Sequence, residues 1–407
     1  MSANSIYVKG DTESQITDLA LYIAKLRGED GDMDAPYVKE IQSIYKDKKD
    51  AVYTQLAKDA SIFLTENNKQ VEGAFNLLVV LVLQAPEAVL KDAVFTLIDT
   101  LTKTESSKIG LKQKILLNLY NALPNDSTLR YNAFIALIEV TAQADELDSL
   151  IGQLEYVDTW AKQWGIGKET ERHLYQYLDE VLLNAGEEKL SLKFALRNLS
   201  TFEARDEKSK KIAKDVIIRA IAMDNYFAFE DLLQYPAVQQ LKEDKNSEEY
   251  ALLDVFLNGN LSTYQEFVKS HPNAVKLCPS PENNLHKMRL LSLASLGSEN
   301  LSRELKYADI AANLQISEDE VEMWVIDVIR AGLVEAKLDQ LNKTVLVHRS
   351  IYRVFGTEQW KKLSTCLNAW KNNLNEILTV IGNAKLIAGG NTAAVTSAIE
   401  NNANANQ

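Results

Sequence analysis

Cysteine, histidine and proline are scarce in this chain of 407 residues, which has two cysteines, four histidines and seven prolines. Cys278 and Cys366 lie far apart and form no CxxC pair, so the sequence predicts neither a disulfide framework nor a thiolate metal cage. No histidine is followed four residues later by a second histidine, the spacing that many helical zinc sites use. We therefore expect no metal and no cofactor.

Long apolar runs and catalytic motifs are missing as well. The longest apolar stretch, residues 77–83, is far shorter than the roughly 20 residues that cross a bilayer. Residues 1–10 have no apolar run after a basic start, as a secretion signal would. There is no GxSxG elbow, and the glycines around Gly165 lack the spacing of a phosphate loop. We expect a cytoplasmic protein that is not an enzyme and does not contact a membrane.

What the sequence has in abundance is helical periodicity. Apolar residues recur at helical spacing in nearly every window from residue 12 to about residue 301. A first helix ends before the Gly, Asp and Pro residues of 28–36, and later helices are expected at 50–65, 71–84, 86–103, 107–123 and 127–143. Helices joined by such short links pack as antiparallel neighbours. The sequence therefore predicts a mostly α protein whose first part is a right-handed helical-repeat solenoid without a strict repeat motif.

After residue 301 the pattern indicates a winged helix. Ser317 and Glu320 form a capping box at the start of a helix over residues 317–330, and Gly332 suits its left-handed end. Alternating residues 333–339 and 344–348, separated by a turn, predict a β-hairpin. Following two shorter helices, this order is the winged-helix form of the helix-turn-helix.

The charge of this module argues against DNA binding. The helix over residues 317–330 carries five acidic residues and one basic residue, a net charge of −4, where a helix that faces phosphates should be positive. The whole chain has a net charge of −13 and repels nucleic acid in bulk. A winged-helix regulator that binds nucleic acid is therefore the least supported binding hypothesis, and no direct DNA binding is expected.

A seven-residue repeat follows the winged helix. Large apolar residues recur at alternating spacings of three and four, and we call them the terminal stripe: Trp360, Leu363, Leu367, Trp370, Leu374, Ile377 and Ile381. On one helix they form a continuous seam suited to a helical bundle with other chains. The alternative is that the helix folds back on its own domain. Residues from 384 onward are mostly small and polar and predict a disordered tail.

Helical repeats, a winged helix and a long terminal helix together resemble the PCI architecture of scaffold subunits in the proteasome lid, the signalosome and translation initiation factor 3. Several stretches are similar to the subunit M family of eukaryotic initiation factor 3. They are residues 285–294, 314–316 and 321–327, and most specifically 355–360 leading into 367–375. The likeness covers residues 206–382.

The resemblance implies a non-catalytic scaffold subunit of initiation factor 3. Its partners would be the other PCI and MPN subunits and, through the complex, the small ribosomal subunit, in preinitiation assembly and mRNA recruitment. A PCI subunit of the signalosome or proteasome lid is the alternative. The implied organisation is a helical array over 1–205, the helical half of a PCI domain over 206–284, a winged helix over 285–355, a bundling helix over 356–383 and a tail over 384–407.

The resemblance also implies that winged helices of neighbouring subunits pair edge to edge. The second hairpin strand is the expected edge strand for such sheet extension, and its residues are Thr344, Val345, Leu346, Val347 and His348.

Overall fold

The structure is a computed structural model of the whole chain. It describes residues 11–30, 32–65, 70–104, 108–202, 207–244, 247–271, 280–300 and 303–404, and the side chains of these residues up to 385. The chain divides into two compact units, Met1–Glu203 and Ala204–Gln407. Each unit is described by itself.

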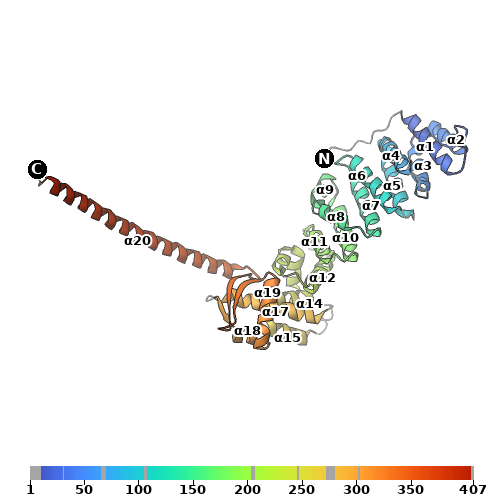
Figure 1. The fold of residues 1–407 in the computed structure, drawn as a ribbon. Coiled ribbons are helices and arrows are strands. Elements are labelled where there is room, and N and C mark those ends of the chain that lie inside the picture. The colour runs from blue at the N-terminus through green and yellow to red at the C-terminus, as the bar shows by residue number, and fades with distance from the viewer. Residues whose placement is uncertain are drawn as a thin grey trace. The chain divides into compact units, whose positions relative to one another are not determined.

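The first unit is an array of helices (Figure 1). The helices are α1 (Thr12–Leu26), α2 (Pro36–Asp47), α3 (Ala51–Asp59), a 3₁₀ turn (Ala60–Leu64), α4 (Gln70–Leu83), α5 (Glu87–Lys103), α6 (Ile109–Ala122), α7 (Leu129–Gln143), α8 (Asp148–Leu154), α9 (Val157–Gln163), α10 (Lys168–Asn184) and α11 (Glu188–Ser200). The helices predicted from periodicity are confirmed, with ends that differ by a few residues.

Helices α1 to α7 stack in two layers. In one layer α4 packs between α1 and α6, and in the other α5 packs between α3 and α7. The apolar residues of α4 lie between these neighbours, with Phe75, Leu78 and Val79 completely buried. A second core continues through α8 to α11, where Trp164 is fully buried and its ring lies 5.5 Å from that of Phe134. Each helix therefore covers its apolar face with helices nearby in sequence.

The second unit begins with helices and ends with the winged helix. Its elements are α12 (Glu207–Ala222), a 3₁₀ turn (Phe229–Gln234), α13 (Pro236–Glu243), α14 (Glu248–Asn258), α15 (Leu261–Ser270), α17 (Pro281–Glu299), β1 (Glu304–Lys306), α18 (Tyr307–Leu314), a 3₁₀ turn (Glu318–Glu320), α19 (Val321–Arg330), β2 (Val334–Asp339), β3 (Thr344–Ser350) and α20 (Thr357–Asn404). The capping box between Ser317 and Glu320 is present, and Gly332 has φ of +72°. The predicted winged helix is confirmed.

The sheet of the winged helix corrects one prediction. Its strand order is β1-β3-β2, with both pairings antiparallel. Strand β3 contains Thr344, Val345, Leu346, Val347 and His348, and it lies in the centre of the sheet. The prediction that these five residues form an edge strand was wrong, because the short strand β1 pairs with the side of β3 that the hairpin leaves open.

The terminal helix is longer than predicted. Helix α20 runs without a break from Thr357 to Asn404, where the sequence pattern indicated a helix to residue 383 and then a disordered tail. Residues 384–404 include six alanines and no proline, which favours continuation of an established helix, while Gly389 and Gly390 oppose it. The prediction missed this because it considered only how little apolar surface the segment could bury.

Candidate protein-interaction site

The terminal stripe is exposed along its whole length. The exposed fractions of its side chains lie between 41% for Leu363 and 62% for Trp370, and every residue from 361 to 385 is exposed. The alternative in which the helix folds back on its own domain is therefore not the arrangement in this structure. Large apolar side chains at this spacing are costly to leave in water, which makes the stripe a candidate contact surface.

Two apolar residues beside the stripe were missed by the sequence reasoning. Leu378 and Val380 are also exposed, at 64% and 66%, and they widen the stripe near Ile377 and Ile381. Strict alternation of three and four skips them, whereas a search for any apolar residue within the same helix turns would have found both. The distal half of the stripe therefore offers a broader apolar face than the proximal half.

Few charges flank the stripe. Among the positions on either side of it in the heptad, only Lys371 carries a charge. In coiled coils the flanking charges choose partner and orientation. Here the large, rigid rings of Trp360 and Trp370 are left to provide selectivity through shape.

A buried arginine fixes the chain where it leaves the winged helix. The Arg353 guanidinium donates through Nε to the carbonyl of Leu291 on α17 (3.1 Å) and through Nη1 to the carbonyl of Gly259 between α14 and α15. Burial lowers the pKa of Arg353 to about 10, which leaves it charged at neutral pH. Arg353 thus ties the residues before α20 to α17 and to the turn between α14 and α15.

The first turn of α20 is held to the same anchor. The Phe355 amide donates to the Glu230 carboxylate (3.0 Å), and the Phe355 ring meets the Trp360 ring edge to face with centroids 5.0 Å apart. The Gly356 amide donates to the Gln359 side chain (3.1 Å). Trp360 therefore packs against the start of the helix and also belongs to the stripe. Trp370 lies two to three turns further along the helix.

Comparisons with known proteins match the winged-helix region and the terminal helix to two separate families. Residues 264–349 match the PCI domain family, and residues 353–381 match the family described as eIF3 subunit M, C-terminal helix. The chain is 34% identical to eukaryotic translation initiation factor 3 subunit M of Phaeosphaeria nodorum, over 93% of this chain and 88% of the relative. It is 33% identical to the Dictyostelium discoideum protein of the same name, over 79% and 80%.

The chain belongs to the eukaryotic translation initiation factor 3 subunit M family.

The subunit M helix match coincides with the terminal stripe. It begins at Arg353, the anchoring residue, and ends at Ile381, the last residue of the stripe. Residues 384–404 of α20 lie beyond it. The part of the helix that the family shares is thus the part that bears the large apolar residues.

The sheet of this subunit M chain offers little for strand addition. Strand β1 has only three residues. Strand β2 carries a register irregularity between Glu335 and Ala336 and exposes the charged residues Glu335, Lys337 and Asp339. Short strands, bulges and charges are the usual devices that keep an edge from pairing with another chain. The sheet therefore gives no support to edge-to-edge pairing.

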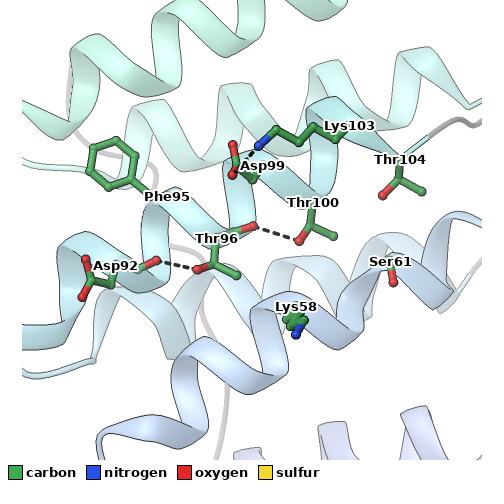
Figure 2. Close-up of a pocket in the computed structure, with 9 residues that line it drawn as sticks. All are labelled: Lys58, Ser61, Asp92, Phe95, Thr96, Asp99, Thr100, Lys103 and Thr104. Atoms are coloured by element: carbon green, nitrogen blue, oxygen red, sulfur yellow. Dashed lines mark hydrogen bonds and ion pairs between the residues drawn. The ribbon is translucent and has the colours of Figure 1, made fainter.

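One hollow of the array is lined mainly by polar and charged side chains. A hollow of about 600 Å³ lies along α3 and α5, and Figure 2 shows the nine residues that line it. Lys103 is paired with Asp99 (2.7 Å), and the Thr96 and Thr100 hydroxyls donate to backbone carbonyls. No histidine or cysteine lines this hollow, and the side chains of Lys103, Thr96 and Thr100 are engaged in these contacts within the array.

Neither a metal site nor a membrane span is found among the residues that the structure describes. In the residues that the structure describes, no three His, Cys, Asp or Glu side chains gather as a metal site would require. Within those same ranges, no helix combines the length and apolar character needed to cross a membrane. Cys366, on α20, is exposed and free.

Proposed function

We propose that this chain is a non-catalytic scaffold subunit of the cytoplasmic translation initiation factor 3 complex. It joins the PCI and MPN subunits of the complex by placing the terminal stripe in a bundle with their helices. In this way it supports assembly of the small ribosomal subunit preinitiation complex and recruitment of mRNA. Family membership and the exposed stripe of α20 support this proposal.

The stripe supports a scaffold role because it leaves a large apolar area exposed to water. Burying the two half-exposed tryptophans would contribute about 2 to 3 kcal/mol each. The fixed start of α20 adds to this, since a helix held at Arg353 and Phe355 loses less freedom on association than a freely jointed one. A scaffold role requires such a contact and requires no reactive group.

The test is a triple substitution of Leu367, Trp370 and Leu374 by aspartate in the full chain. Three charges placed inside a bundle would cost several kcal/mol, so we expect incorporation into the complex to fall more than tenfold. Because these side chains are exposed, the thermal melting of the isolated chain should not change. The measurement is copurification with tagged initiation factor 3, together with melting followed by circular dichroism.

A matched control adds the same charge to the same helix. Asn368, Asn372 and Asn375 lie on the side of α20 away from the stripe, and their replacement by aspartate should leave incorporation at the parental level. If the stripe variant still enters the complex at parental stoichiometry, the stripe is not the attachment surface. If it melts early as an isolated chain, the helix packs on its own domain.

A further inference from the structure

A second exposed apolar surface lies on the winged helix, distinct from the terminal stripe. On α19, Met323, Ile326 and Ile329 are 55%, 47% and 36% exposed, and their spacing of three places them on one side of the helix. Leu341, in the turn between β2 and β3, is 92% exposed. We call these four residues the α19–wing surface.

Polar contacts hold the turn beside the first turn of α19 and the 3₁₀ turn that precedes it. The Gln340 side-chain amide donates to the Glu322 carboxylate (2.8 Å), and the Lys343 ammonium pairs with Glu318 (3.1 Å). Leu341 lies between these two residues in sequence. The apolar residues of the turn and of the helix therefore belong to one surface.

The opposite side of α19 is packed firmly against α17. The Trp324 ring is buried and contacts the His286 ring at 4.9 Å between centroids, and the Arg289 guanidinium lies 5.1 Å from its centre. These contacts fix the rotation of α19 about its axis. Met323 and Ile326 are therefore presented outward by a rigid element, which lowers the entropic cost of binding.

Acidic residues lie beside the exposed apolar residues, mainly at the start of α19. Asp319 and Glu320 are exposed in the turn that precedes α19, and Glu322 accepts hydrogen bonds from two neutral donors, Tyr307 (3.2 Å) and Gln340. Glu318 and Asp327 are paired with Lys343 and Arg330. The net charge of −4 over residues 317–330 thus lies mostly toward the start of the helix.

The acidic residues of this surface indicate which kind of partner can bind to it. Helix and wing are the elements with which many winged helices hold nucleic acid, but acidic residues here repel phosphates. A second copy of the chain would bring the same acidic residues against one another. An apolar helix face with an acidic rim is complemented by an amphipathic helix whose apolar stripe is flanked by Lys or Arg.

The geometry points to the α19–wing surface as a docking site for a basic amphipathic helix of another chain in the complex. Such a helix lays its apolar stripe over Met323, Ile326 and Leu341 and places its basic residues near Asp319 and Glu322. The inference rests on the proposed function only in taking the partner from the same complex, and it requires neither the stripe nor the sheet edges.

The test places a photo-crosslinking amino acid at position 323 of the full chain, assembled in purified initiation factor 3. We expect a cross-link to an apolar segment of another subunit that carries a net positive charge. A cross-link to RNA, to a second copy, to an acidic segment, or no cross-link at all would overturn the inference. The same residue introduced at Leu117, an exposed apolar position on α6, serves as the control for non-specific reaction.

Substitutions test the energetics of this contact. Met323→Asp combined with Ile326→Asp should lower incorporation at least tenfold, and Asp319→Lys should lower it a few-fold with weaker salt dependence. Leu117→Asp should have no effect. If the stripe variant still assembles while the Met323 and Ile326 variant does not, the proposed attachment surface is wrong and this inference stands. Parental incorporation of both α19 variants, with the cross-link absent, would remove the inference alone.

Discussion

Helices α4 and α20 have the same kind of apolar periodicity, but the apolar face of α4 is buried and that of α20 is exposed. Both show large apolar residues at helical spacing, yet Phe75, Leu78 and Val79 of α4 are completely buried, whereas Trp370 of α20 is 62% exposed. Helix α4 has α1 and α6 on either side in the same layer of the array. Periodicity therefore identifies the face of a helix that needs cover, and the fold decides whether the same chain supplies it.

The difference also shows how a subunit can stay stable while offering contacts. The array covers most of its own apolar faces with its own helices. The stripe on α20 and the α19–wing surface remain open on elements that are anchored by Arg353 and Trp324. The free energy available for assembly is thus kept separate from the free energy that folds the chain.

The sharpest test of the comparison removes one aromatic ring from each helix. Phe75→Ala should lower the free energy of unfolding of the first unit by about 3 to 5 kcal/mol, because it leaves a cavity beside Phe63. Trp370→Ala, although a larger truncation, should change the stability of the isolated chain by no more than about 0.5 kcal/mol. Urea unfolding of both variants measures the two effects.

Incorporation into the complex should reverse this ranking. Trp370→Ala should weaken assembly, whereas Phe75→Ala should affect it only as far as the first unit unfolds. A destabilisation by Trp370→Ala comparable to that by Phe75→Ala would break the comparison, because it would mean that the chain itself covers the stripe.

A smaller effect is expected at the boundary between the buried and exposed regions. Arg353→Ala leaves the carbonyls of Leu291 and Gly259 without their charged donor and should destabilise the second unit by about 1 to 3 kcal/mol. Arg353→Lys keeps the charge and one donor group and should recover part of the loss. Thermal melting of the second unit, followed through a label near α17, distinguishes the variants, and equal melting of all three would show that Arg353 is no anchor.

The smallest effect concerns pH and is confined to the array. Burial, with the nearby Glu139 carboxylate, raises the pKa of Tyr177 to about 12. The folded state therefore holds this proton more tightly than the unfolded state, so the stabilisation is complete below pH 10 and is lost as the pH rises toward 12. In Tyr177→Phe the fall in unfolding free energy between pH 9 and pH 11 should be shallower than in the parent. An identical pH slope would contradict the raised pKa. Helix α20 contains no tyrosine and should show no such dependence.

Local signals were enough to predict much of the winged helix. The capping box at Ser317, the left-handed Gly332 and the alternating residues of the hairpin depend on neighbours only a few residues away, so the sequence shows them directly. The edge of the sheet could not be predicted in this way. Strand β1 has three residues and enters a helix at once, which is too short for alternation to be recognised, and its pairing with β3 joins segments about 40 residues apart.

The sequence by itself determined where most helices of this protein form, which face of each is apolar, and where the charge opposes nucleic acid. These properties follow from the identity and spacing of residues along one chain. Only the tertiary structure decided which apolar faces are covered, which strand lies in the centre of the sheet, and which arginine holds the terminal helix. Burial and strand order depend on contacts between distant segments, and no local pattern encodes those contacts.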